Sequence, residues 1–301
     1  MNKKLFLFLS LLVIVTLACG GTAPTSAEPD QAQLETMVAA TLQAVTQEAA
    51  NNPTATSAPS GTAFTYNNIE LIIPDGFATG TQTEIVPRTD ATDDMPYWIA
   101  TPEYLKVTFS QTLSFTSKFE AVLQVLPAEE FMQMSENASE KITTLQSQLA
   151  NGDPKGVKVL PPFNAGLMLD ARNEIFDFQN GNGVRSIQEY HQYSAPITND
   201  YLIYSYQGIT SDGKYYVSFV APIRVPFLID ESYNPDPNST TPTPLPPAEG
   251  FTYPSASTLG GGPEYDQYIK SIADKFAQTP PEQFSPSLDT LDALVRSILI
   301  K

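Results

Sequence analysis

The stretch "YLIYSYQGITSDGKYYVSFVAPI", residues 201–223, decides the fold class because it holds two strand-forming arms joined by a turn. Aromatic and β-branched side chains, which favour pleated strands, dominate both arms. Between the arms, "TSDG" at residues 210–213 supplies the small and polar residues that a tight turn requires. The stretch therefore predicts an antiparallel hairpin whose arms are half-buried.

A second hairpin is expected immediately before this one. "AGLMLDARNEIFDFQ" (165–179) and "VRSIQEYHQY" (184–193) have the composition of strands. "NGNG" (180–183) between them is a strong turn signal, because Asn and Gly adopt positive φ at low cost. Earlier strands are expected at residues 65–73, 103–113 and 118–127, the first of them ending at the turn Pro74-Asp75-Gly76.

Helices are expected between and after these strands. Residues 128–151 have a mostly helical pattern that ends at Gly152, and two further helices close the chain, the second beginning at Ser285-Pro286. This order predicts an α+β fold over residues 64–301, a single domain with a mainly antiparallel sheet packed by helices. The apolar stripes expected to face the sheet are Tyr265, Tyr268, Ile269, Ile272 and Phe276 in one closing helix and Leu288, Leu291, Leu294, Val295, Ile298 and Leu299 in the other.

Residues 230–263 interrupt this domain with a segment rich in Pro, Gly, Ser and Thr. A segment of this length without secondary structure is uncommon inside a compact domain and is typical of a functional loop or of disorder. We interpret it as an insertion that flanks the core, and disorder is the favoured interpretation.

The first 18 residues have the layout of an export signal. Lys3 and Lys4 precede an apolar segment, residues 5–18, which is shorter than the about 20 residues that cross a bilayer as a helix. Cys19, the only cysteine in the chain, follows directly. A one-pass membrane anchor with a buried cysteine is the alternative interpretation.

Thr16-Leu17-Ala18-Cys19 resembles the lipobox of bacterial lipoproteins. In that family the signal is removed, and the cysteine receives a diacylglyceryl group and becomes the new N-terminus. The resemblance implies a signal peptide at residues 1–18, lipidation at Cys19, and export to the outer face of the cell membrane or envelope. Two or three acyl chains would hold the protein durably in membrane lipid.

The charge composition restricts the possible partners. The chain has 33 acidic and 16 basic residues, and its net charge is -17. Such a surface repels nucleic acid and anionic lipid head groups. We therefore expect no nucleic-acid partner, and a covalent attachment to the membrane through Cys19 instead of an electrostatic one.

Residues 19–63 are predicted to be a tether that contains one amphipathic helix, at about residues 30–50. A helix isolated between two linkers is marginally stable by itself. It must lie on the domain, pair with a second copy, or contact another protein. We expect loose packing on the domain, with weak self-association through residues 30–50 as the alternative. The positions of its apolar face at helical spacing are Leu34, Met37, Val38, Thr41, Leu42 and Val45.

The order of the elements carries a further resemblance. With the turn "IPDGF" (73–77) after the first strand and a closing helix, the domain is similar to the PsbP-like α/β sandwich over about residues 64–299. The layout of signal, "ACGG" (18–21), Thr/Pro-rich tether and "AQLETMVAATLQAV" helix (32–45) also resembles uncharacterised bacterial membrane lipoproteins. That second resemblance implies an anchored protein but no activity.

No catalytic motif stands out in the sequence. The only histidine, His191, follows Glu189 in "EYHQY" and is expected at the surface or in a cross-strand pair. One histidine and one cysteine cannot form a Cys/His zinc site, and phosphate-loop and dinucleotide fingerprints are absent, so no metal or cofactor is predicted. The acidic segments 89–94 and 230–238 are interpreted as solvated loops, with weak calcium binding as the alternative.

Tyrosines gather in the two hairpins and form a candidate binding face. Tyrosine suits partner surfaces because it is large and rigid and has a polar tip. Side-chain alternation along strands turns about half of them inward, so packing in the core is the other interpretation. The candidate residues are Tyr190, Tyr193, Tyr204, Tyr206, Tyr215 and Tyr216, with Tyr201 in the same span.

Together these features favour a lipid-anchored binding or envelope-assembly module without catalytic activity, for a protein or glycan partner. A hydrolase that uses a carboxylate pair and an accessory solute-binding protein are the alternatives. A concave pocket lined by two close carboxylates would favour the hydrolase. A flat, exposed aromatic sheet face would favour the binding module.

Deletion of residues 30–50 distinguishes the two interpretations of the tether helix. A helix that lies on its own domain leaves the oligomeric state unchanged, and we expect this result in sedimentation velocity. Self-association through the helix requires the opposite result, namely that the intact chain sediments faster at rising concentration and that the deletion abolishes this dependence.

Overall fold

The computed structural model describes residues 60–92, 96, 99–111, 115–230, 251 and 262–301. These residues belong to one compact unit, Ala58–Lys301. The predicted signal segment, Cys19 and the tether helix lie outside the described residues, as do most of the tether and most of the insertion at 230–263.

Strands and helices of the described residues have the following bounds. The strands are β1 (Gly61–Tyr66), β2 (Ile69–Pro74), β3 (Gly80–Val86), β4 (Tyr104–Ser110), β5 (Ala121–Pro127), β6 (Gly166–Phe178), β7 (Gly181–His191), β8 (Ile203–Thr210), β9 (Tyr215–Pro222) and β10 (Leu299–Ile300). The helices are α3 (Ala128–Met134), α4 (Glu136–Asn151), α5 (Pro263–Gln278) and α6 (Leu288–Arg296), with a 3-10 turn, η3, at Pro281–Gln283.

The strands form two antiparallel sheets. A three-stranded sheet has the order β1-β2-β10, and a seven-stranded sheet has the order β3-β4-β5-β9-β8-β7-β6. Neighbouring strands pair antiparallel throughout both sheets. The predicted α+β class with a mainly antiparallel sheet packed by helices is confirmed.

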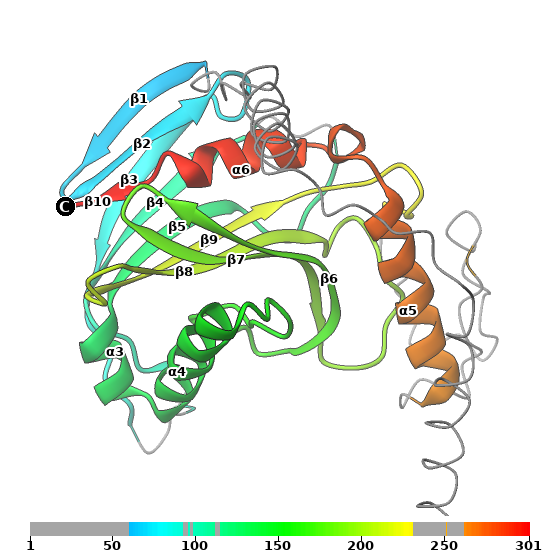
Figure 1. The fold of residues 1–301 in the computed structure, drawn as a ribbon, viewed down its shortest axis with the longest axis horizontal. Helices are drawn as coiled ribbons and strands as arrows, with labels where there is room; N and C mark the ends of the chain where they lie inside the picture. Colours follow the sequence, from blue (N-terminus) through cyan, green and yellow to red (C-terminus); the bar gives the residue numbers. More distant parts are fainter. Residues whose placement is uncertain (1–59, 93–95, 97–98, 112–114, 231–250, 252–261) are drawn as a thin grey trace, which may run out of the picture. The chain divides into compact units, whose positions relative to one another are not determined.

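Both faces of the seven-stranded sheet are covered (Figure 1). On one face, here named the α6 face, side chains of α5, α6 and the three-stranded sheet join the main apolar core. On the opposite face, the α4 face, α3 and α4 bury a second core. All residues of β8 and all but Tyr215 of β9 are buried. The expectation of half-buried arms is therefore wrong, because packed elements cover both sides of the hairpin.

Two turns differ from the sequence prediction. The expected single strand at residues 65–73 is a hairpin of β1 and β2, and its turn places Asn67 at φ 51°, a conformation that Asn tolerates. The turn between β6 and β7 lies at residues 179–180, because Phe178 already pairs with Gly181. Gly183 is therefore inside the strand, where a Cβ would lie 2.7 Å from Cζ of Tyr206.

The helices follow the predicted order with shifted ends. The predicted helix after residue 128 divides at Ser135, whose hydroxyl accepts a bond from the Ala138 amide and caps α4, and Gly152 ends α4 at φ 69°. The last helix begins at Leu288 with Ser287 as its N-cap, not at Ser285-Pro286. Ile298 and Leu299, both predicted within this helix, follow its last residue, Arg296, and Leu299 pairs with Glu70 of β2 as part of β10.

The close packing at Gly183 generates a stability prediction. In Gly183→Ala the new Cβ would lie 2.5 Å from the Gln207 carbonyl oxygen as well as against the Tyr206 ring, so the strands must separate. We expect the free energy of unfolding to fall by about 1–3 kcal/mol. Gly80→Ala is the matched control, because no atom lies within 4 Å of a Cβ there, and its effect should be within about 0.5 kcal/mol. Equal effects in urea denaturation would contradict the packing argument.

Candidate functional site

Most of the candidate tyrosine face is in the interior. Tyr204 and Tyr206 are fully buried on the α6 face, where their hydroxyls donate to Asp292 Oδ1 (2.8 Å) and to the Phe176 carbonyl (2.9 Å). These bonds tie the central strand β8 to α6 and to β6. Core packing, the second interpretation of the tyrosines, applies to both residues.

The other candidate tyrosines do not share one surface either. Tyr190 and Tyr216 are buried on the α4 face, Tyr215 is half-buried, and Tyr193 is the one candidate with most of its surface exposed, at 60%. The structure therefore does not bring the six residues together as an exposed binding face. Covering elements on both sides of the sheet are the physical reason.

Buried polar side chains of β7 hold a loop against the α4 face. This loop, residues 157–165, is here named the covering segment. The Val159 amide donates to the Tyr190 hydroxyl (3.0 Å), and Gln188 Nε2 donates to the Val157 carbonyl (2.6 Å). The Tyr190 hydroxyl in turn donates to Gln188 Oε1 (3.1 Å). Backbone groups of the covering segment are thus satisfied by the sheet itself.

Strands β8 and β9 complete this attachment. Gln207 Oε1 accepts the Leu160 amide (3.2 Å) and the Tyr216 hydroxyl (2.7 Å), and Gln207 Nε2 donates to Ser205 Oγ (3.1 Å). The side chains of Leu160, Ser205, Gln207 and Tyr216 are all buried. Breaking one bond would leave buried polar atoms without partners, which costs about 1–3 kcal/mol, so the covering segment is held firmly.

The covering segment forms one wall of a large cleft on the α4 face. The cleft has a volume of about 850 Å³. Its floor consists of side chains of β4, β5 and β9, and further lining residues are Val86, Thr89, Pro96, Ile99 and Thr101. Most of its lining is apolar. The principal lining residues are Tyr104, Lys106, Phe119, Val122, Val159, Pro161, Pro162, Phe163 and Val220.

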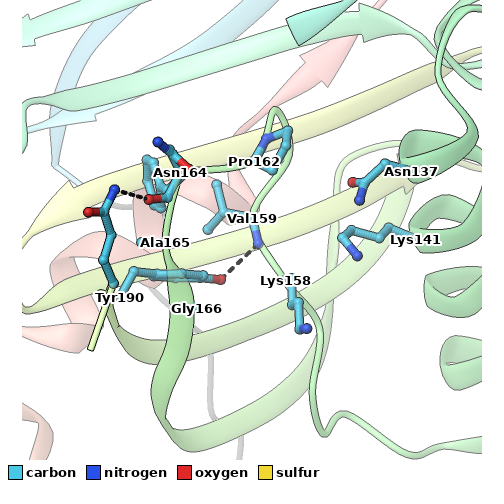
Figure 2. Close-up of a pocket in the computed structure, with 11 residues that line it drawn as sticks. Asn137, Lys141, Lys158, Val159, Pro162, Asn164, Ala165, Gly166 and Tyr190 are labelled. Atoms are coloured by element: carbon cyan, nitrogen blue, oxygen red, sulfur yellow. Dashed lines mark hydrogen bonds between the residues drawn. The ribbon is translucent and has the colours of Figure 1, made fainter. Parts of the chain in front are cut away.

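A smaller hollow lies on the other side of the same segment, between it and α4 (Figure 2). Its volume is about 420 Å³, and it shares Val159, Pro162, Phe163 and Asn164 with the large cleft. The two cavities therefore adjoin at these four residues. Lys141 extends from α4 toward the covering segment in Figure 2, and the remaining polar lining residues are Asn137, Lys158, Tyr190 and Gln192.

The charges around the two cavities differ in sign from the chain as a whole. Lys141 and Lys158 line the small hollow without any acidic neighbour in its lining. Lys106 and Lys118 line the large cleft, where Glu120 is the acidic lining residue. Lys106 is neutralised by Glu84 at 2.7 Å. The other three lysines form no ion pair within the described part of the chain.

His191 and Glu189 form a buried pair on the α6 face. His191 Nε2 and Glu189 Oε1 are 2.6 Å apart, and the Thr198 amide donates to both carboxylate oxygens of Glu189 (3.3 and 3.1 Å). His191 is only 7% exposed, so the expected surface position is wrong. Burial raises the pKa of Glu189 to about 7, against the opposing effect of its hydrogen bond with His191.

Neither criterion set for the function hypotheses is met in the described residues. The large cleft has one lining carboxylate, Glu120, and the flat tyrosine face is not formed. Among the residues that the structure describes, no three His, Cys, Asp or Glu side chains gather as a metal site. Asp93 and Asp94 of the acidic segment 89–94, and nearly all of 230–238, lie outside that part of the chain.

Sequence reasoning missed both cavities. One sequence pattern is related to the cavities: Ser and Gln occupy alternate positions of β7 and β8, at Ser186, Gln188, Ser205 and Gln207. On an amphipathic strand such residues indicate a solvent face. Here they bind a loop, because the glutamine amides offer both donors and acceptors to its backbone.

The raised pKa of Glu189 predicts a pH dependence of stability. The unfolded carboxyl loses its proton near pH 4.5, whereas the folded one keeps it to about pH 7. The unfolded state therefore binds fewer protons in this window, and this residue's contribution to the free energy of unfolding falls as pH rises through it, by up to about 3 kcal/mol. Glu189→Gln removes the titration, so the wild-type curve should drop relative to the variant between pH 4.5 and 7. Parallel curves in chemical denaturation would refute the prediction.

Comparison with protein-family models finds no match for this chain, and comparisons with curated proteins and with solved structures find none either. Within the described residues, no helix combines the length and apolar character that crossing a membrane requires. The cavities and their lining residues are therefore the basis for a functional proposal.

Proposed function

We propose that this chain is an exported lipoprotein, anchored through acylated Cys19 at the outer face of the cell membrane or envelope, whose domain binds a ligand in the large cleft. The observation that carries the binding proposal is the 850 Å³ cleft with a wall held by buried hydrogen bonds. Ligand sites are typically concave, mostly apolar and pre-formed, with a few polar groups. The large cleft has each of these properties.

The lining of the cleft supports binding over hydrolysis. Carboxylate-pair hydrolysis needs two acids that flank the scissile bond. Glu120 is the acidic side chain among the residues that line the cleft. His191 lies on β7 at a position that alternates with Tyr190, which puts it on the opposite face of the sheet, paired with Glu189.

The anchor rests on the sequence alone. Lys3 and Lys4, the apolar residues 5–18 and the adjoining Cys19 support export and acylation. A net charge of -17 disfavours electrostatic adhesion to anionic membranes, so covalent lipid is the attachment that suits this protein. An anchor of this kind would hold the domain, with its cleft, outside the cell.

Acylation is tested by the intact mass of protein extracted from native membranes. We expect loss of residues 1–18 together with the added mass of two or three acyl chains on Cys19. In Cys19→Ser the thiol that accepts the lipid is absent, so the signal should remain and no acyl mass should appear. An unmodified full-length wild-type chain would refute the anchor without affecting the cleft.

Ligand binding is tested by native mass spectrometry of protein from the same membranes. The wild-type chain is expected to carry a bound compound. Val122→Trp fills the floor of the cleft and should lose most of that compound. Ile85→Trp is the control, because Ile85 is 52% exposed on β3 and does not line the cleft. Equal occupancy in both variants, or no bound compound in the wild type, would contradict the proposal.

A further inference from the structure

We infer that the ligand is an amphipathic anion, with its apolar body in the large cleft and its anionic group in the small hollow beside Lys141. The inference rests on the proposed function, since it names the chemical class that the same site would take. A free fatty acid and an anionic phospholipid share this chemistry.

The charge distribution provides the first argument. The chain has 33 acidic and 16 basic residues, so a lining drawn at random would hold about two acids for each base. The two cavities instead have four lysines and one glutamate in their linings. Lys106 is paired with Glu84, and Lys118 and Lys158 are exposed, so the partly buried Lys141 is the lysine whose attraction for an anion is least screened by water.

Lys141 is placed to make the direct contact. It is partly buried on the second turn of α4, extends toward the covering segment, and forms no ion pair within the described residues (Figure 2). The neighbouring acids of α4, Glu136 and Glu140, are exposed and do not line the hollow. A carboxylate or phosphate at this position would form a charge-assisted hydrogen bond with the Lys141 ammonium. Lys158 lines the same hollow and adds a second positive charge.

The apolar lining decides between hydrocarbon and sugar as the ligand body. Sugars stack on open aromatic faces and require many polar partners. In this site Phe163 packs on Phe119 (ring centroids 5.1 Å apart) and edge-to-face on Tyr190 (5.0 Å), so its faces are partly occupied. Val122, Val220 and the Pro161-Pro162 pair supply aliphatic surface beside them. Such a surface favours a hydrocarbon chain through burial of apolar area.

The two cavities lie close enough for one ligand to use both the apolar lining of the large cleft and Lys141 of the small hollow. The large cleft and the small hollow share Val159, Pro162, Phe163 and Asn164, so they are adjacent across the covering segment. An amphipathic ligand with its apolar body in the large cleft and its head group beside Lys141 would therefore lie across the covering segment at Phe163. Hydrogen bonds from the Val159 and Leu160 amides to Tyr190 and Gln207 hold the covering segment in position without a ligand.

Isothermal titration of residues 19–301, produced without the signal segment so that Cys19 receives no lipid, uses decanoate and 1-decanol as probes with the same chain length. Both are kept below their aggregation limits. We expect decanoate to bind with a dissociation constant at least about tenfold lower than that of 1-decanol, because only decanoate can use the lysine. A second arm with dihexanoylphosphatidylglycerol compares the phospholipid source with the fatty acid. Tighter binding of either anion identifies which source the site prefers.

Variants show whether the anion lies where we infer. Lys141→Gln should weaken decanoate binding about tenfold and leave 1-decanol unchanged, and Lys158→Gln should weaken decanoate binding less. Lys155→Gln is the matched control, an exposed lysine near the covering segment that does not line either cavity, and should have no effect. Unchanged thermal unfolding verifies that each variant folds.

Equal binding of the two ten-carbon probes, or no effect of Lys141→Gln, would overturn the inference. Absence of binding for all three probes would overturn it as well. If Val122→Trp still removes a compound that the wild-type chain carries from its native membranes, the proposed function survives and the ligand belongs to another class. If no such compound exists, both proposals fail together.

Discussion

Burial of the central strands on both faces is the constraint on which the rest of this structure depends. The main core covers one face, and on the other face the strands carry glutamines and serines that have lost contact with water. A buried amide without partners is costly, so Gln188 and Gln207 bind the backbone of the covering segment. The position of the covering segment therefore follows from the need of these buried amides for hydrogen-bond partners.

The same arrangement produces the site. Hydrogen bonds hold the covering segment against the sheet, and the segment divides the α4 face into two adjoining cavities. Lysines outnumber acidic residues in the linings of both cavities, although the chain as a whole has a net charge of -17. The long-range field of such a protein repels anions, so the anion that we infer would be held by short-range contact with lysine and by burial of its apolar part.

Local patterns predicted much of the fold and little of the site. The "TSDG" turn, the stop of α4 at Gly152 and the stripes of the closing helices up to Val295 depend on neighbouring residues, and the structure confirms them. The hairpin turn after β6 was predicted too late, because "NGNG" contains glycines that serve close packing against Tyr206 and not the turn. The tyrosines were ambiguous for a related reason, since strand alternation assigns side chains to faces but does not tell which faces are covered.

The sequence by itself determined the α+β class, the antiparallel pairing of the hairpins and the acidic character of the chain, because composition and short-range periodicity suffice for them. It also carries the export and lipidation hypothesis at Cys19. Only the tertiary structure decided that the central tyrosines are core, that His191 is buried with Glu189, and that lysines from α4 and from the covering segment meet in one hollow. These facts depend on contacts between residues distant in the chain, and no local pattern encodes which surface another element will cover.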